Sequence, residues 1–312
     1  MQIELGIKSD PIEYRFSYEW LFDLMRRHDV RNLQFGSFTE LYFLPEEFFV
    51  DLRRTADSYG VRMKSVFTSH RELGGAFTGN PHLEGVATRN YERLLEIAAV
   101  LGADYCGSNP GAVYRDRPDT KPHGIRRWLD MAKGLMHKAH REGLKAMTLE
   151  PMSCTAEPPT TPEEIGSMIT ELNDYHVTNA ESTVPFYLCT DIAHGHADRN
   201  GRVIHGNLEL FEYAVPWTCE FHIKNTDAIF NSTFGFSDAD VAGGIVDLEL
   251  IRDLIVRNEE RWPVEDLVGY LELSGPKLGR DYSDYLLEEQ LECSLRRIKR
   301  DLADIISTPT TA

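Results

Sequence analysis

The chain has 312 residues, enough for one large α/β domain or two ordinary ones, with a formal net charge of −17 and a pI of about 5.1. This acidity, which solubility alone explains, argues against a broad basic surface for a phosphate backbone, so we expect no nucleic-acid partner. No apolar stretch is long enough to span a bilayer, and we expect no leader because the first residues lack a basic segment followed by an apolar one. Five cysteines without paired metal spacing suit a reducing compartment. We therefore expect a cytoplasmic protein with no membrane partner.

Eight short apolar runs rich in β-forming residues recur along the chain. Spread over eight units, 312 residues give about 39 residues each, close to what a strand, a helix and two loops require. We predict strands near 2–7, 32–38, 61–69, 103–109, 144–150, 185–191, 219–225 and 267–273.

The segments between these runs repeat apolar residues at helical spacing, and several open with Pro, Asp or Ser and stop at Gly. They predict helices over 17–28, 45–60, 90–103, 125–143, 161–174, 247–259 and 285–306. Alternating strands and helices imply parallel strands, and eight units favour an α/β fold closed as a (β/α)8 TIM barrel over an open doubly wound sheet. Without a linker or a composition break, we expect a single domain over 1–312, with a flexible tail at about 306–312.

Four polar residues stand at the C-terminal ends of the last four predicted strands: Glu150, Asp191, His222 and Glu272. The active sites of TIM barrels lie at this end of the strands. A carboxylate turned outward against the helix layer would be an expensive unpaired charge, so an inward placement at the rim is favoured. Each residue alone is explained as a helix cap or a surface charge. Together, three carboxylates and one imidazole form a ligand set for a hard divalent ion such as Mg2+ or Mn2+.

The segments LEPM, TDIAH, FHIKNTD and YLELS occur in this order around the four residues. They resemble the xylose-isomerase-like TIM barrels of the sugar-phosphate isomerase/epimerase family, and within it the ketose 3-epimerases of the D-tagatose 3-epimerase type. The resemblance covers nearly the whole chain in strand order and is specific over its second half. It implies that Glu150, Asp191, His222 and Glu272 bind one Mn2+, Mg2+ or Co2+. The D-x-x-H motif of the family matches Asp191 to His194 and assigns His194 to substrate binding.

The chemistry of a ketose fits such a centre. Removing the C3 proton leaves a cis-enediolate, whose negative charge a divalent ion stabilises as a Lewis acid. Glu150 and Glu272 form the natural catalytic pair, because each can transfer a proton on one face of the sugar. Epimerisation needs both faces, whereas aldose–ketose isomerisation can use one. Two carboxylates therefore favour 3-epimerisation.

The substrate-binding residues follow the family pattern less closely. The family carries an Arg downstream of the strand-seven His, but the segment from His222 to Asp227 has none. Lys224 has the strand parity of His222 and either points into the site or pairs with Asp227 at the rim. Glu157 is a candidate for the acidic residue that the family carries shortly after the strand-five Glu.

Further polar residues follow the earlier predicted strands: Lys8, His70, Asn109 and Arg115, with Arg71 and Arg117 beside them. Each alone is explained as a solvated loop residue. Gathered on one face they would suit an anionic substrate, because Arg binds phosphate through paired hydrogen bonds and Lys acts as a point charge. The expected partner is therefore a small ketose or ketose phosphate, with the phosphate preferred and a phosphorylated tetrulose or pentulose as one example.

The segment after the seventh strand, STFGFSDADVAGG, contains aromatic residues and glycines. It either folds over the substrate, with Phe234 or Phe236 shielding it from water, or is a flexible connection with a buried Phe.

Three other functions share parts of this pattern. An inosose-type dehydratase would use the same enediolate to expel a hydroxyl group. An AP endonuclease of the endonuclease IV type would need further metal-binding histidines, for which His70 is the candidate, and a basic face for DNA. A barrel that binds a sugar without turnover is disfavoured by two opposed carboxylates, although fold alone does not decide function. The exact sugar, the native metal and assembly into a homo-oligomer stay open.

Overall fold

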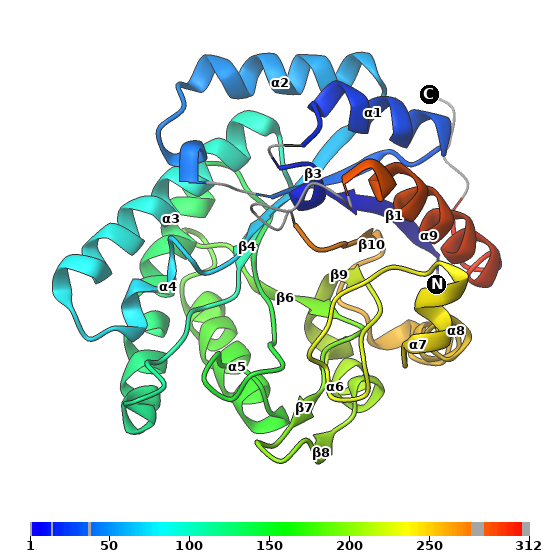
Figure 1. Cartoon of the computed structure of the whole chain (residues 1–312). Helices are drawn as coiled ribbons and strands as arrows, with labels where there is room; N and C mark the ends of the chain where they lie inside the picture. The colour runs from blue at the N-terminus through cyan, green and yellow to red at the C-terminus, as the bar shows by residue number, and fades with distance from the viewer. Residues whose placement is uncertain (1, 14, 37–38, 276–283, 308–312) are drawn as a thin grey trace.

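Eight parallel strands close into one barrel surrounded by helices in the computed structural model, which describes residues 2–13, 15–36, 39–275 and 284–307 (Figure 1). The barrel order is β1–β10–β9–β6–β5–β4–β3–β2. The predicted (β/α)8 TIM barrel is confirmed, with every predicted strand present. The strands are β1 (Ile3–Lys8), β2 (Asn32–Phe35), β3 (Arg62–Thr68), β4 (Tyr105–Ser108), β5 (Ala146–Leu149), β6 (Phe186–Asp191), β9 (Thr218–Ile223) and β10 (Leu267–Leu271).

The seven predicted helices are present, and two further helices and a hairpin were not predicted. The helices are α1 (Tyr18–Arg27), α2 (Glu46–Ser58), α3 (Pro81–Leu101), α4 (Lys121–Arg141), α5 (Pro162–Thr178), α6 (Asn207–Ala214), α7 (Asp238–Gly243), α8 (Leu248–Arg257) and α9 (Leu287–Asp301). The hairpin consists of β7 (His196–Ala197) and β8 (Val203–His205). Helix α3 starts at Pro81 rather than at residue 90, because the side chain of Asn80 caps it by accepting a hydrogen bond from the backbone of His82.

Helices cover the barrel by packing aromatic and aliphatic side chains against the outward faces of the strands. Trp128 of α4 meets Phe186 of β6 with ring centroids 5.8 Å apart, and Phe211 of α6 meets Phe221 of β9 at 5.6 Å. All four rings are buried, and each contributes on the order of 1.5–3 kcal/mol through burial. Because outward positions pack against helices, the alternate positions of each strand face the barrel interior.

The register of the strands brings the predicted site residues to one end of the barrel. Asp191 of β6 pairs with His222 of β9, which pairs with Tyr270 of β10. Glu150 follows the last residue of β5, and Glu272 follows the last residue of β10. All four predicted ligands therefore lie at the C-terminal mouth of the barrel.

The chain returns to β1 after α9. Ile306 forms a parallel bridge with Ile3, and the backbone N–H of Ser307 donates to the carbonyl of Ile3 at 2.8 Å. The first two residues of the predicted tail are thus hydrogen-bonded to the barrel, while 308–312 lie outside the described residues. Among the described helices, none combines the length and the apolar character needed to cross a membrane.

Candidate metal centre

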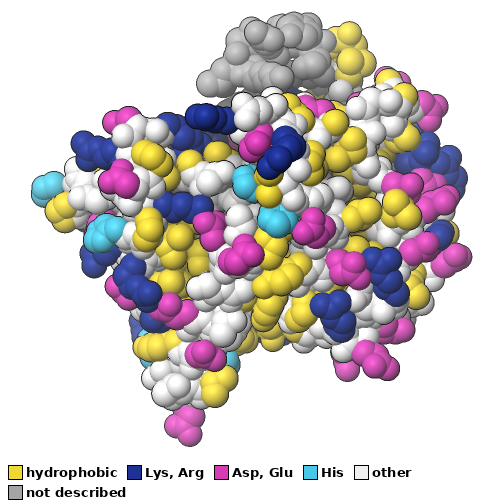
Figure 2. Space-filling view, turned by 90° about the horizontal axis from the view of Figure 1, so that it is seen from below, with side chains coloured by type: hydrophobic (Ala, Val, Ile, Leu, Met, Phe, Trp, Pro, Cys, Tyr) yellow, Lys and Arg dark blue, Asp and Glu magenta, His cyan; other side chains and the backbone are white. Residues whose placement is uncertain are grey.

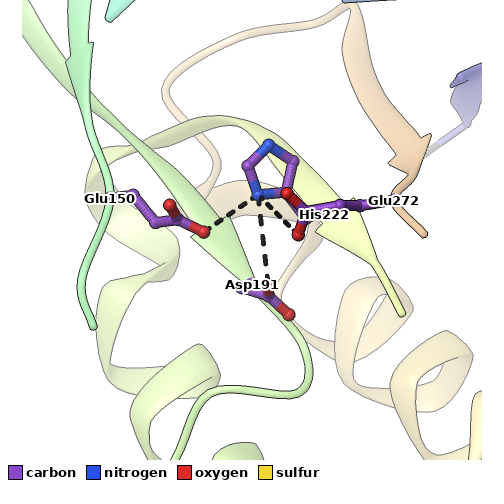
Figure 3. A group of neighbouring side chains, drawn as sticks. All are labelled: Glu150, Asp191, His222 and Glu272. Carbon is purple, nitrogen blue, oxygen red and sulfur yellow. Dashed lines mark hydrogen bonds and ion pairs between the residues drawn. The ribbon is translucent and has the colours of Figure 1, made fainter. Parts of the chain in front are cut away.

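Glu150, Asp191, His222 and Glu272 meet at the mouth of the barrel, and one ligand atom from each lies within 4.8 Å of the others (Figure 3). Nδ1 of His222 is 2.9 Å from Oε1 of Glu150, 3.6 Å from Oε2 of Glu272 and 4.0 Å from Oδ2 of Asp191. This group could hold a metal ion, because carboxylate oxygens and a neutral imidazole nitrogen are the donors that divalent ions accept.

Local structure aims the side chain of Asp191 into this group. Its Oδ1 accepts a hydrogen bond from the backbone N–H of Ala193 at 2.8 Å, in the turn that follows β6. This contact leaves Oδ2 on the side of His222. The backbone of Glu272 is held in turn by a hydrogen bond from its N–H to the carbonyl of Ile223 at 3.0 Å. The carboxylate of Asp191 and the backbone of Glu272 are therefore both held by hydrogen bonds at the strand ends.

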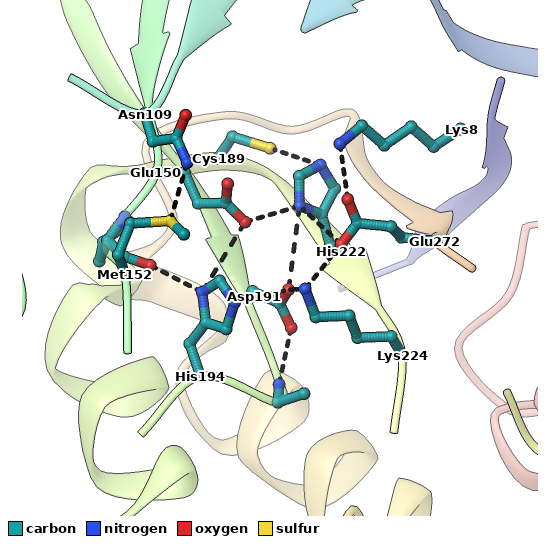
Figure 4. A network of polar contacts seen from close by, with 12 residues as sticks. Lys8, Asn109, Glu150, Met152, Cys189, Asp191, His194, His222, Lys224 and Glu272 are labelled. Carbon is teal, nitrogen blue, oxygen red and sulfur yellow. Dashed lines mark hydrogen bonds and ion pairs between the residues drawn. The ribbon is translucent and has the colours of Figure 1, made fainter. Parts of the chain in front are cut away.

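Two buried lysines neutralise the carboxylates of Asp191 and Glu272 (Figure 4). Nζ of Lys8 lies 2.6 Å from Oε1 of Glu272. Nζ of Lys224 lies 2.8 Å from Oε2 of Glu272 and 2.6 Å from Oδ2 of Asp191. Lys224 thus points into the site, one of the two placements left open by the sequence. Asp227 instead accepts hydrogen bonds within its own loop, from the backbone of Ile229 and from other loop groups.

The electrostatic balance keeps the two glutamates charged. Burial alone would raise the pKa of Glu150, but the neighbouring His222 and His194 outweigh it and lower this pKa to about 2. Burial likewise opposes ionisation of Glu272, yet Lys224 and Lys8 hold its pKa well below the usual value. Burial lowers the pKa of His222, Lys224 and Lys8, and the surrounding carboxylates more than compensate, so all three are raised. Both glutamates are therefore deprotonated near neutral pH.

His194 lies at the edge of the same group, as the D-x-x-H resemblance implied. Its Nδ1 is 2.8 Å from the carbonyl of Pro151 and 3.8 Å from Oε1 of Glu150. Its Nε2 is 3.5 Å from Oδ2 of Asp191. The imidazole is therefore held by the backbone in a position next to two of the candidate ligands.

A cavity of about 730 Å³ adjoins the four-residue group. His194, Lys224, Arg115 and Arg199 are among the side chains that line it. Nη2 of Arg115 donates to Oε1 of Glu157 at 2.9 Å, which brings the predicted Glu157 to the border of this cavity. The volume is that of a small-molecule site, and its lining combines cations with hydrogen-bonding groups.

The other predicted rim residues lie apart from this cavity. Asn109 is buried, and its side chain joins two loops by accepting from the backbone N–H of His70 at 2.6 Å and donating to Sδ of Met152 at 3.1 Å. Arg71 and Arg117 are exposed and are not among the residues that line the cavity. The predicted cations are therefore divided between the buried centre, the cavity and the outer surface.

The aromatic residue at the cavity is not one of the two considered from the sequence. Phe236 is buried and its backbone N–H donates to Oγ of Ser294, so it belongs to the core. Phe234 pairs with Asn225 through two backbone hydrogen bonds. Phe230, with a φ of 61°, lines the cavity and packs on Gly195, where an added Cβ would lie 2.2 Å from the ring. The contact requires glycine at 195, which is the one sequence signal that could have indicated it.

Comparison with known proteins supports the fold. The sequence matches neither a protein-family model nor a curated protein. Solved structures with the same xylose-isomerase-like TIM barrel include a putative xylose isomerase from Rhodospirillum rubrum, at 16% identity over 96% of this chain and 99% of that chain, with a TM-score of 0.75. D-psicose 3-epimerase from Clostridium cellulolyticum, solved with D-tagatose, matches at 14% identity over 97% and 99%, with a TM-score of 0.70. An IolI protein with a bound zinc atom matches at 16% identity over 98% and 100%, with a TM-score of 0.67.

At the level of the fold, these likenesses confirm the resemblance found in the sequence. The chain shares the TIM-barrel fold of these structures, and it carries at its mouth a group of three carboxylates and one imidazole that could hold a metal ion.

Proposed function

We propose that the chain is a divalent-metal-dependent epimerase or isomerase of a ketose or ketose phosphate, acting by 3-epimerisation through a cis-enediolate. The observation that carries this proposal is the placement of Glu150 and Glu272, which approach His222 from opposite sides (Figure 3). They follow β5 and β10, which are separated in the barrel by β6 and β9. Two opposed carboxylates can serve the two faces of a sugar bound between them.

In this proposal Glu150, Asp191, His222 and Glu272 hold one Mn2+, Mg2+ or Co2+. The donor set suits these ions, since three of the four ligands supply oxygen. The bound ion supplies Lewis-acid stabilisation of the negative charge that develops on substrate oxygens.

The residues of the chain carry out the proton transfers. One of the two carboxylates, Glu150 or Glu272, removes the proton at C3 and later releases it to water. The other takes a proton from water and returns it to C3 on the opposite face. Their lowered pKa values keep both ready to accept a proton near neutral pH. His194 and Lys224 lie beside the carboxylates and line the cavity, so we assign them to binding the substrate oxygens. That a fold neighbour is a D-psicose 3-epimerase supports the choice of reaction.

For the substrate we favour an anionic sugar, a tetrulose or pentulose phosphate. Arg115 lines the cavity together with Arg199, and a guanidinium group matches phosphate geometry. Elsewhere cations are dispersed: on the face shown in Figure 2, Lys and Arg side chains are interspersed with Asp and Glu. A local pair of arginines at the cavity of a chain with a net charge of −17 therefore supports an anionic ligand at this place.

Dehydration is the second candidate, and Lys224 is the observation that favours it. Its ammonium group lies 2.8 Å from Oε2 of Glu272. An ammonium at this distance from the proposed base could donate a proton to a departing hydroxyl of the same substrate. An inosose-type dehydratase would thus use the same residues with a different outcome.

The test is incubation of the protein, reconstituted with Mn2+, with a panel of ketoses and ketose phosphates in D2O. Deuterium incorporated at C3 supports 3-epimerisation, deuterium at C1 indicates an aldose–ketose shift, and loss of water indicates dehydration. A parallel sample with chelator reports the metal requirement. Absence of exchange and of water loss across the panel, with metal bound, would overturn the proposal. Equal turnover of the phosphorylated and the free sugar would remove the support for a phosphate.

A further inference from the structure

The two ring nitrogens of His222 face different surroundings. Nδ1 is directed at the candidate ligands Glu150, Asp191 and Glu272, whereas Nε2 points into the barrel interior (Figure 4). Oε1 of Gln34, on β2, lies 2.8 Å from Nε2. Both side chains are fully buried, so no solvent competes for this contact. A neutral imidazole carries one proton, and the nitrogen that binds a metal must be the one without it.

We propose that Gln34 is a positioning residue that fixes His222 as the tautomer protonated at Nε2, so that the lone pair of Nδ1 faces the metal site. The inference deepens the proposed function, because it depends on a metal ion binding at His222. A hydrogen bond from the second ring nitrogen to a buried acceptor is the usual means by which a ligand histidine is oriented. Nothing else among the described contacts offers Nε2 an oxygen acceptor.

The direction of the Gln34 amide is set by its other neighbours. Oγ of Ser65 donates to Oε1 of Glu220 at 3.0 Å, and Oγ1 of Thr148 donates to the same oxygen at 3.3 Å. Because the proton of Ser65 is used in this way, its oxygen accepts from Nε2 of Gln34 at 3.4 Å. The amide nitrogen therefore faces Ser65, and the amide oxygen faces His222.

In this chain of hydrogen bonds through the barrel interior each side chain donates to the next: His222 to Gln34, Gln34 to Ser65, and Ser65 to Glu220. All four side chains are fully buried. Rotating the Gln34 amide by half a turn would place its NH2 against Nε2 and would leave Ser65 facing a carbonyl oxygen while its own proton is already donated. That arrangement would lose the hydrogen bond between Gln34 and Ser65 in a place where water cannot replace it, so it is disfavoured.

Cys189 is the competing neighbour of the same nitrogen. Its Sγ lies 3.3 Å from Nε2 of His222 and 3.6 Å from Nε2 of Gln34. A thiol is a weak donor and a weak acceptor. Nδ1 also faces an acceptor, Oε1 of Glu150 at 2.9 Å, so the contact to the Gln34 carbonyl matters when a metal ion replaces the proton at Nδ1: it keeps the remaining proton on Nε2.

The experiment measures Zn2+ affinity by competition with a chromophoric chelator. Gln34→Leu keeps the size of the side chain and removes the acceptor, and we expect it to bind Zn2+ roughly 10–100-fold more weakly than the wild type. Gln34→Glu retains an oxygen acceptor and should recover most of the affinity. Asn32→Leu is the matched control: Asn32 lies two residues earlier on β2, is buried, and donates to Oε2 of Glu4 away from the centre. It should bind Zn2+ as the wild type does.

A second readout reports the tautomer directly. In Zn2+-loaded protein labelled with 15N-histidine, long-range 1H–15N correlations should assign the proton of His222 to Nε2 and the metal to Nδ1. A proton on Nδ1 would overturn the inference, even if Gln34→Leu fails to fold. Wild-type affinity in Gln34→Leu, or equal losses in Gln34→Leu and Gln34→Glu, would overturn it as well. These outcomes would contradict the role of Gln34 but not the metal site. A wild type that binds no Zn2+, Mn2+ or Co2+ would refute the proposed function itself.

Discussion

Oδ2 of Asp191 lies 2.6 Å from Nζ of Lys224, although Asp191 belongs to a group that could itself hold a cation. The ammonium group of Lys224 would therefore compete with any metal ion bound there for the carboxylate oxygen of Asp191. We predict that Lys224→Met strengthens Mn2+ binding by about tenfold, because it removes a competing charge-assisted contact, while turnover falls because a substrate-binding group is lost. Titration calorimetry with Mn2+ measures the first effect. Lys133→Met, which breaks an ion pair with Glu171 on the helix layer, should change neither. Unchanged or weaker Mn2+ binding would contradict the prediction.

Glu150→Gln and Glu272→Gln should each abolish exchange of the substrate C3 proton. An amide retains an oxygen that can bind a metal but cannot accept the proton, so we expect turnover to fall by about 10²–10⁴-fold. Proton NMR of the substrate in D2O measures the exchange, and thermal unfolding of each variant checks that the barrel is intact. A normal exchange rate in either folded variant would refute the assignment of two bases.

Metal removal should destabilise the protein measurably. An ion that binds the folded chain alone adds about 2.7 kcal/mol at a hundred times its Kd, which corresponds to a rise in Tm on the order of 5–10 °C. Differential scanning fluorimetry with Mn2+ and then with excess chelator measures this shift. Asp191→Asn weakens one ligand and should respond much less to the same Mn2+ concentration. An identical Tm with and without the ion in the wild type would argue against the centre.

The barrel was predictable because its strands are separate apolar runs of regular spacing, each bounded by turn residues. Its mouth was predictable for the same reason: Glu150 and Asp191 stand where such runs end. Helix α6 was missed because it has only eight residues and follows Gly206, an N-cap residue without a side chain that the sequence would reveal as a cap. The strands of the β7–β8 hairpin are shorter still, with two and three residues, and their pairing depends on contacts between His196 and His205 rather than on an apolar pattern.

The partners of the site residues were less predictable than the residues themselves. Lys8 was expected at the rim as a cation for phosphate, but it is buried against Glu272, because a carboxylate in the barrel needs a counter-charge. Gln34 carries no motif, and a polar residue within a strand is commonly a surface residue. Its role depends on β2 lying across the barrel from β9, a relationship that the closed topology creates and local sequence does not record.

Arg115 should contribute to the use of a phosphorylated substrate. It lines the cavity and is otherwise paired with Glu157. We predict that Arg115→Leu raises KM for a ketose phosphate by about 10–100-fold, because a bidentate charge-assisted contact is lost, and leaves KM for the free sugar nearly unchanged. Arg117→Leu is the matched control, since Arg117 is an exposed residue of the same loop that does not line the cavity. Equal effects on both substrates would exclude Arg115 as a phosphate ligand.

Glu220 should make the stability of the metal-free barrel fall as pH rises. It is fully buried on β9, and burial raises its pKa above the ordinary value of 4.5, while Ser65 and Thr148 donate to one of its oxygens. Below pH 4.5 both the folded and the unfolded chain hold this proton, so the ionisation of Glu220 does not change the free energy of unfolding. Above pH 4.5 the unfolded chain releases the proton while the folded chain retains it, so the free energy of unfolding decreases until the folded pKa is passed.

Glu220→Gln has the shape of the protonated side chain and no proton to lose. Its Tm should therefore match the wild type near pH 5 and exceed it increasingly towards pH 8, by roughly 2–4 °C for each kcal/mol recovered. Thermal unfolding in chelator at several pH values tests this, because every other titrating group is common to the two proteins and cancels in the difference. A difference in Tm that stays constant with pH, or that favours the wild type at pH 8, would mean that Glu220 is ionised inside the barrel and that the interior hydrogen bonds stabilise its charge.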